Sequence, residues 1–316
     1  MSASLDGSSP RAKSPWSTRL RLAGTVLSLL LLAWLLWKQD WDTLVASAVG
    51  MPAGRLLLAF GLILVCQLWN SARWLALLNG QDIRPGYLRT VQIVFAGLFA
   101  SNFLPTTIGG DVVRVVGVVK VTRDRVVGAA TVVMDRAVSV FGMLFVLPFS
   151  WPLVQGLLSA GPWLNGSLAL ADRRLIRRVA RWSARAKDAL AIWARRPLSV
   201  VLALLASWVG VACYLAAVWL VAGGLGIPVS LGDVAGATAL TYFLTLLPIS
   251  INGYGLREVG MLALYVQLGA TAEQASALAL ITRAMLMIVS LPGALWLGKV
   301  AGAAGPSAGE GESRAG

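Results

Sequence analysis

Two arginines close the same short pattern in two distant parts of the chain. The pattern Leu-Pro-x-x-Ile-x-Gly-x-x-x-Arg begins at Leu104 and ends at Arg114, and it begins again at Leu247 and ends at Arg257. Proline removes a backbone donor and glycine permits tight turns, so each copy should break the apolar segment around it. The arginine guanidinium is a planar fork of donors that matches a phosphate group. The two copies therefore predict an anion-binding site built from broken apolar segments.

The glycines of both copies are candidates to hold the same anion. A helix that starts after Gly109-Gly110, or after Gly253-Tyr254-Gly255, would present backbone N–H groups without partners. Such helix starts bind phosphate well. We therefore expect each arginine to act together with the helix start beside it.

Carboxylates accompany both arginines. Asp111 precedes Arg114 by three residues and would share its helix face, whereas Glu258 follows Arg257 directly and need not. Each carboxylate would orient the arginines or contact cationic parts of the bound ligand. Alternatively, each arginine only neutralises a nearby carboxylate in a buried structural pair. Amides beside the two copies are further candidates, or they satisfy the broken backbone: Asn102 and Asn252.

Other charged residues interrupt apolar stretches. A charge inside a membrane is costly enough to mark a functional site by default. The arginines among them would instead reach the headgroups if they lie near the ends of membrane spans. These secondary candidates are Arg73, Asp135, Arg136 and Arg283.

The composition is that of an integral membrane protein. Of the 316 residues, 57% are hydrophobic and only 13% are charged, about half the charged share of a soluble domain. The net charge of +13 comes from arginines clustered between apolar segments, without a nucleic-acid-binding motif, so nucleic acid is not an expected partner. Two cysteines and no histidine argue against a disulfide framework, a zinc site and histidine catalysis. We expect no cofactor, no metal and no catalytic residue.

The apolar stretches predict an all-α membrane domain over residues 20–300. With about 20 residues per crossing, we expect about six to eight transmembrane helices. The two regions that contain the motif would each form a full span with a loop or a re-entrant hairpin of two half-helices. The stretch 151–171 is a weak further span. The clear spans and the two broken regions are 20–37, 56–78, 126–149, 198–222 and 273–298, and then 88–119 and 233–268.

The distribution of basic residues predicts the topology, because Lys and Arg in short loops favour the cytoplasm. The N-terminal segment 1–19 and the segment 172–196 are strongly basic, and basic residues flank 88–119 on both sides. This pattern requires 88–119 to enter and leave from the cytoplasmic face and 151–171 to cross. The region 233–268 would then enter from outside. The two motif copies would form an inverted repeat, as in many transporters.

The basic segment 172–196 has its own candidate role. Its apolar residues recur every three or four positions between arginines, which predicts an amphipathic helix in the headgroup plane. The same charges would set the topology or recruit anionic lipids, and both interpretations stay open. The tail 301–316 is rich in Gly, Ala and Ser and is expected to be disordered.

These motifs give the chain a resemblance to the transmembrane region of lysylphosphatidylglycerol synthases, over roughly residues 20–300. The resemblance implies a polytopic helical protein of the bacterial cytoplasmic membrane that moves lipid headgroups between leaflets, with a cytoplasmic N-terminus. Because the chain stops soon after its last span, we expect no aminoacyltransferase domain and no synthesis of lysylphosphatidylglycerol. The resemblance rests on Asn102-Phe103-Leu104-Pro105, Gly109-Gly110-Asp111-x-x-Arg114, Asp135-Arg136, Leu247-Pro248-Ile249-Ser250, Gly253-x-Gly255-x-Arg257-Glu258 and Arg283.

The leading hypothesis is therefore a translocase of a phospholipid or a polyprenyl-phosphate-linked lipid. No ATP-binding loop is present in the sequence, so transport would run down a gradient or be coupled to an ion. Two alternatives stay open. One is a membrane-embedded transferase acting on lipid phosphates or glycolipids. The other is a non-transporting partner of a lipid-synthesis enzyme. The candidate protein partners are such an enzyme and a second copy of the chain.

Overall fold

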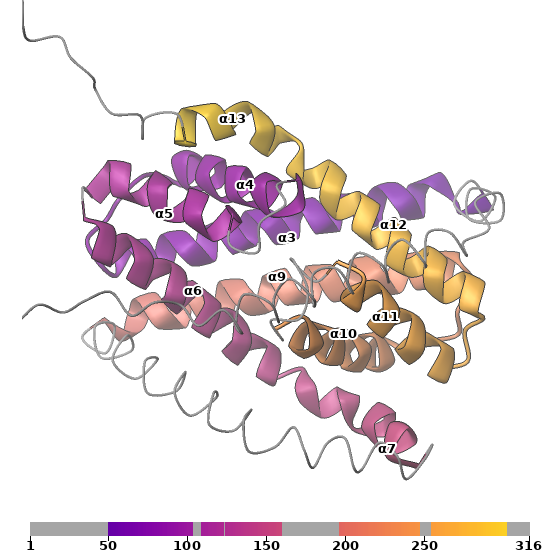
Figure 1. Ribbon diagram of the computed structural model, residues 1–316. Helices are drawn as coiled ribbons and strands as arrows, with labels where there is room; N and C mark the ends of the chain where they lie inside the picture. The colour runs from indigo at the N-terminus through magenta and orange to yellow at the C-terminus, as the bar shows by residue number, and fades with distance from the viewer. Residues whose placement is uncertain (1–49, 104–108, 123, 160–195, 247–253, 302–316) are drawn as a thin grey trace, which may run out of the picture.

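The computed structural model describes residues 50–103, 109–122, 124–159, 196–246 and 254–301. All regular structure within these ranges is helical, as predicted (Figure 1). The elements are α3 (Ala53–Asn79), α4 (Tyr87–Phe103), α5 (Gly109–Thr122), α6 (Arg125–Leu144), the 3-10 turn η1 (Leu147–Ser150), α7 (Trp151–Ser159), α9 (Pro197–Gly224), α10 (Leu231–Thr245), α11 (Leu256–Gln267), α12 (Ala272–Ser290) and α13 (Pro292–Ala301).

Several helices begin at side chains that satisfy the first backbone donors. Asp124 accepts hydrogen bonds from the N–H groups of Val126 and Val127 at the start of α6. Ser230 and Thr271 cap α10 and α12 in the same way, each within a reciprocal capping box. These caps fix the residues at which the helices begin, although the surrounding sequence is apolar.

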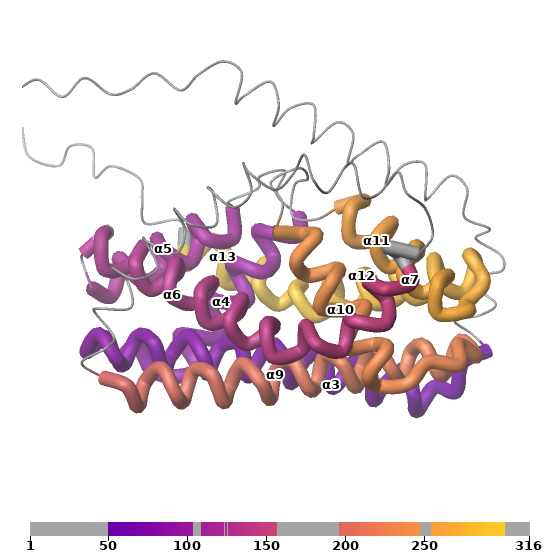
Figure 2. The backbone as a smooth tube through the Cα atoms, turned by 90° about the horizontal axis from the view of Figure 1, so that it is seen from below, coloured from indigo at the N-terminus to yellow at the C-terminus, as the bar shows by residue number. Residues whose placement is uncertain are grey.

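The two longest helices, α3 and α9, pack antiparallel and run the length of the bundle (Figure 2). At one end, the Arg55 guanidinium donates to the Gly223 carbonyl oxygen over 3.3 Å. At the other end, Arg196 donates to both carboxylate oxygens of Asp82 over 2.6 Å. We call the first the Arg55 end and the second the Arg196 end of the bundle.

Within the described residues, four helices are long and apolar enough to cross a membrane: α3, α6, α9 and α12. They confirm the positions of the predicted spans 56–78, 126–149, 198–222 and 273–298, but the last is too long. Pro292 lacks a backbone donor, so α12 ends at Ser290 and the chain continues as the separate helix α13. The helix at the predicted span 126–149 is also shorter than predicted, since α6 ends at Leu144 before the turn that contains Pro148.

The first broken region forms a pair of short helices. α4 and α5 have 17 and 14 residues, too few to cross about 30 Å of hydrocarbon as helices. They pack antiparallel, because Gly117 lies against Ile93 while Gly110 lies against Gly97. α4 begins a few residues after α3 ends, so this pair opens at the Arg196 end. The described part of 88–119 is therefore arranged as a re-entrant hairpin would be.

The second broken region forms a similar pair at the opposite end. α10 and α11 have 15 and 12 residues. α10 begins shortly after α9 ends, and the Gln274 amide at the start of α12 donates to the Leu225 carbonyl oxygen at that same end. The α10–α11 pair thus opens at the Arg55 end (Figure 1). Opposite entry of the two pairs is what the predicted topology requires, while the inverted repeat itself stays a prediction.

The chain also changes ends between α7 and α9. In α7, the Leu153 carbonyl oxygen accepts a hydrogen bond from the Gln267 amide over 3.0 Å, at the Arg55 end. Arg196, which precedes α9, lies at the opposite end. The predictions for 1–19, for the span 20–37, for 160–195 and for 302–316 lie outside the described residues.

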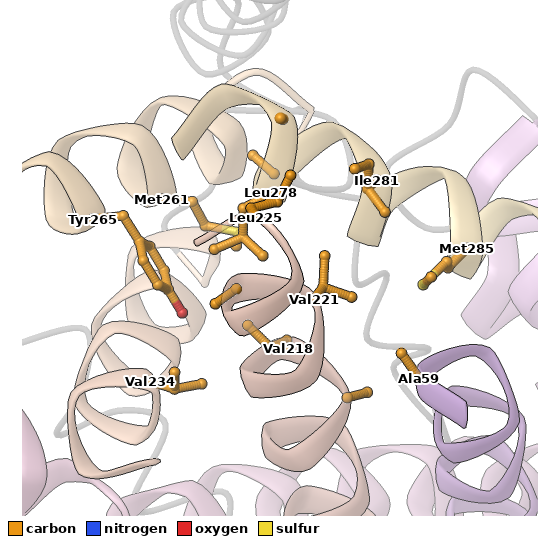
Figure 3. Packing of buried hydrophobic residues seen from close by; sticks show 14 of the residues in the cluster. Ala59, Val218, Val221, Leu225, Val234, Met261, Tyr265, Leu278, Ile281 and Met285 are labelled. Atoms are coloured by element: carbon orange, nitrogen blue, oxygen red, sulfur yellow. The ribbon is translucent and has the colours of Figure 1, made fainter. Parts of the chain in front are cut away.

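The largest apolar core joins α3, α9, α10, α11 and α12. Figure 3 shows Val218, Val221 and Leu225 of α9 packed between Ala59 of α3 and Leu278 of α12, with α11 beside them. Small residues let these helices approach closely, as in other helical membrane proteins. The core thereby fixes the α10–α11 pair against the long helices.

Replacing Gly110 by alanine is expected to destabilise the protein by about 1–3 kcal/mol, because α4 leaves no room for a Cβ atom. That atom would overlap Ser101 Oγ and the backbone oxygen of Gly97, and the backbone cannot rotate away. The matched control is Gly61→Ala in α3, where no atom lies within 4 Å. It should be neutral or stabilising by up to about 1 kcal/mol. Denaturant titration in detergent micelles measures both, and equal effects would contradict the packing argument.

Candidate functional site

A buried carboxylate, Asp135 of α6, joins two arginines from other helices. Its side chain is only 1% exposed. Arg73 of α3 donates from Nε to Oδ1 over 2.8 Å and from an Nη atom to Oδ2 over 3.3 Å. Arg114 of α5 donates to Oδ2 over 2.7 Å. Two positive charges thus share one buried negative charge.

A second carboxylate extends this group. Arg136 donates to Asp111 Oδ1 over 2.8 Å, and the same oxygen lies 3.9 Å from an Nη atom of Arg114. The Asp111–Arg114 contact is the one that their three-residue spacing predicts. The Arg114 guanidinium also lies 4.3 Å from the ring centre of Trp74. Arg114 is therefore held on several sides by the protein itself.

A second charged group surrounds Glu258, at the start of α11. Its Oε1 lies 3.6 Å from both Arg257 Nη1 and Arg283 Nε, and the residue is fully buried. Arg257 donates from Nη2 to the Tyr214 hydroxyl over 2.7 Å and to Thr282 Oγ1 over 3.3 Å. The Arg283 guanidinium lies 3.7 Å from the ring centre of Tyr254. Although Glu258 directly follows Arg257, the tertiary structure brings their charges together.

The described motif glycines lie in different environments. Gly255 has φ +75°, which favours glycine, and its N–H donates to Glu258 Oε2 over 2.8 Å. The carboxylate thus occupies a donor that was expected to bind phosphate. Gly110 is buried against α4, while Gly109 is the first residue of α5 and is partly exposed. Gly253 and Asn252 lie outside the described residues.

A direct contact joins the two motif regions. The Tyr254 hydroxyl, just before α11, donates to the backbone oxygen of Asn102 near the end of α4 over 2.5 Å. The Asn102 side-chain nitrogen Nδ2 is buried and finds no hydrogen-bond partner among the described residues. The inner ends of the two short-helix pairs therefore meet inside the bundle.

Two neighbouring cavities lie between the charged groups. The larger has a volume of about 280 Å³, and its charged lining residues are Arg73, Arg136 and Arg257. The smaller has about 160 Å³ and includes Arg114 and the carboxylates of Asp111 and Asp135. Both cavities are lined by Arg73, Arg136, Gln67 and Asn70. The two motif arginines thus line different cavities, and the secondary candidates Arg73 and Arg136 line both.

Sequence reasoning missed the polar residues that complete this lining. Gln67, Asn70 and Arg73 recur every three positions on one face of α3, which was the available signal. Ser207 and Tyr214 are isolated polar residues in the apolar helix α9, and their spacing gave no signal. In α10, hydroxyl residues recur at similar spacing: Thr238, Thr241, Tyr242 and Thr245. Among the described residues, no group of side chains is arranged to hold a metal ion.

The fold and the cavities define a multi-pass α-helical membrane protein with an arginine-lined interior. Residues 21–293 match the family described as the lysylphosphatidylglycerol synthase TM region, and the chain belongs to that family. Membership indicates a function related to membrane lipids. No curated protein and no solved structure matches the chain.

Proposed function

We propose that the protein moves a phosphate-bearing lipid between the leaflets of the membrane, as a transporter and not as an enzyme. The observation that carries this proposal is the excess of positive charge around the two cavities. In the described part of the two charged groups, five arginines face three carboxylates. An excess of two positive charges inside a membrane protein is costly unless an anion compensates it.

The depth of the charged groups supports transport. Asp135 is ten residues into α6 and Arg283 is eleven residues into α12, which corresponds to about 15 Å along each helix. Half the hydrocarbon thickness of a bilayer is also about 15 Å. A headgroup at this depth is about equally far from both surfaces, as an alternating-access mechanism requires.

Donors remain available for phosphate oxygens. Arg257 Nη1 and Arg283 Nη2 are buried and have no hydrogen-bond partner among the described residues. Charge-assisted hydrogen bonds to phosphate are about twice as strong as neutral ones. Arg257, which lines the larger cavity, is therefore the proposed principal ligand, and Arg73 and Arg136 are the proposed partners.

The state of the carboxylates favours transport over transfer chemistry. Asp111, Asp135 and Glu258 each lie within 4 Å of two arginines. A carboxylate whose oxygens contact guanidinium groups in this way is not free to exchange a proton with a reacting group. In the proposal these carboxylates hold the arginines in place between transport cycles.

The bacterial cytoplasmic membrane is the proposed location, with the Arg196 end facing the cytoplasm. That end carries Arg84, Lys120, Arg196 and Lys299, whereas the loops of the Arg55 end between α9 and α10 and between α11 and α12 contain no Lys or Arg. Basic residues in short loops favour the cytoplasmic side. The same assignment places the N-terminus in the cytoplasm if one span precedes α3.

The proposal is tested by following acyl-labelled phospholipids in proteoliposomes, with a membrane-impermeant quencher reporting the outer leaflet. Arg257→Ala and Arg136→Ala should each slow lipid movement at least about tenfold, because one charge-assisted hydrogen bond contributes about 1.5–3 kcal/mol. Arg257→Lys should recover only part of the rate, since lysine lacks the planar fork.

The control is Arg55→Ala, whose guanidinium contacts the Gly223 carbonyl oxygen away from both cavities. It should transport like the unmodified protein. Helix content and elution profile establish that each variant folds. Normal transport by folded Arg257→Ala and Arg136→Ala proteins would refute the proposal.

A further inference from the structure

We infer that the transported headgroup is a net anionic phosphate joined to a hydroxyl-rich substituent, such as a polyol or a sugar, and carries no ammonium group. This inference rests on the proposed function, because it names the class of substrate for the same cavity. It is carried by the lining of the larger cavity, which is basic and rich in hydroxyl groups but lacks acidic side chains.

The larger cavity offers no carboxylate to a cation. Its charged lining residues are Arg73, Arg136 and Arg257. Asp111 and Asp135 line only the smaller cavity, and Glu258 lines neither. An ammonium group placed in the larger cavity would lose its hydration and face guanidinium groups, and both effects oppose binding.

Hydroxyl groups form much of the remaining polar lining. Eight hydroxyl side chains, from α6, α9, α10 and α11, face the larger cavity. Several already donate to backbone oxygens of their own helices, as Ser139 does to Asp135 and Thr241 does to Ala237. Their oxygen lone pairs can still accept hydrogen bonds. Such a lining suits a ligand that has hydroxyl groups to donate.

Two of these hydroxyl groups are the proposed partners of the ligand hydroxyls. Ser207 of α9 and Tyr265 of α11 are each 1% exposed, and their oxygens have no hydrogen-bond partner among the described residues. Figure 3 shows the Tyr265 hydroxyl directed away from α11. An unpaired buried hydroxyl destabilises a protein, and a ligand hydroxyl would satisfy it.

The volume is consistent with a small headgroup. About 280 Å³ corresponds to roughly nine water molecules at about 30 Å³ each. A phosphate with a short polyol fits this space. The cavity lining combines three arginines for the phosphate with hydroxyl partners for the substituent.

The test compares four acyl-labelled lipids in the same proteoliposomes: phosphatidylglycerol, phosphatidic acid, phosphatidylethanolamine and an aminoacylated phosphatidylglycerol. Phosphatidylglycerol should move at least about tenfold faster than either amine-bearing lipid. The double variant Tyr265→Phe/Ser207→Ala should lower the phosphatidylglycerol rate about threefold to tenfold per lost hydrogen bond and leave phosphatidic acid unchanged.

The double variant removes only oxygens that have no hydrogen-bond partner in the described part of the chain, so a purely structural role predicts no loss of transport. Tyr87→Phe is the control, because the Tyr87 hydroxyl bonds to the Leu68 carbonyl oxygen outside both cavities. Helix content confirms folding in each case.

Equal or faster movement of the amine-bearing lipids would overturn the inference and leave the proposed function standing. So would an unchanged phosphatidylglycerol rate in the double variant. If no lipid moves, native mass spectrometry of the protein with each lipid measures binding and separates failure of the proposed function from failure of the inference. If no lipid moves but phosphatidylglycerol binds selectively and the double variant loses that selectivity, the proposed function fails and the ligand class holds. If binding is also unselective, the inference fails.

Discussion

Replacing Asp135 by alanine is expected to lower the free energy of unfolding by about 3–5 kcal/mol, the usual cost of removing one partner from a buried ion pair. Arg73 and Arg114 both donate to this carboxylate, and their side chains are only 12% exposed. Without Asp135, two positive charges lie close together on largely buried side chains and lose their shared negative partner. The measurement is a denaturant titration in mixed micelles, followed by helix content.

The matched control is Asp82→Ala, at the Arg196 end of the bundle. Asp82 accepts equally short hydrogen bonds from Arg196, at 2.6 Å, but its side chain is 62% exposed. Water replaces this partner easily, so the expected loss is at most about 1 kcal/mol. Asp135→Asn keeps a hydrogen-bond acceptor but not the charge. It should lower the free energy of unfolding by less than Asp135→Ala and by more than Asp82→Ala. A small effect at Asp135 would show that Arg73 and Arg114 are compensated by something else.

Glu258→Ala is expected to cost a similar amount, about 3–5 kcal/mol, for two reasons that act together. The carboxylate is the nearest negative charge to both Arg257 and Arg283, at 3.6 Å from each. It also accepts the Gly255 N–H at the start of α11. Its removal leaves the two arginines facing each other and frees a buried backbone donor.

Asp233→Ala separates these two contributions. Asp233 likewise accepts the N–H of the residue before its helix, Ser230, over 2.9 Å, but no arginine is paired with it in the described part of the chain. Its loss should cost only the capping contribution of about 0.5–2 kcal/mol. Glu258→Gln keeps a side-chain oxygen that can accept the Gly255 N–H, so its cost measures the contribution of the negative charge alone. The same titration measures all three variants, and equal costs for Glu258→Ala and Asp233→Ala would contradict a charge-balancing role.

We therefore expect the buried charges to have a structural role as well as the proposed transport role. In each group, carboxylates lie among more guanidinium groups than they can neutralise. Such an arrangement is stable enough to fold yet leaves positive charge for a ligand. An incoming phosphate would compensate that charge without displacing any carboxylate.

Local features of the sequence were sufficient to predict the membrane class and most helices. An apolar stretch of span length has no alternative to a helix in a bilayer, so α3, α9 and most of α6 and α12 follow directly. Proline and glycine in the two motifs predict the breaks after α4 and α10, because their effects on the backbone are local. The Asp111–Arg114 contact also follows from helix periodicity alone.

The tertiary structure decided which arginines face the cavities. Arg114 and Arg257 occupy equivalent positions in the repeated pattern, yet Arg114 is held by Asp135 and Trp74 while Arg257 lines the larger cavity. These partners come from helices far apart in the sequence. Their distances depend on how closely α4, α5 and α6 pack, which small residues such as Gly97 and Gly110 control. A charged side chain inside a membrane pairs with an opposite charge close to it. Helix packing, and not the local sequence, determines which residue supplies that charge.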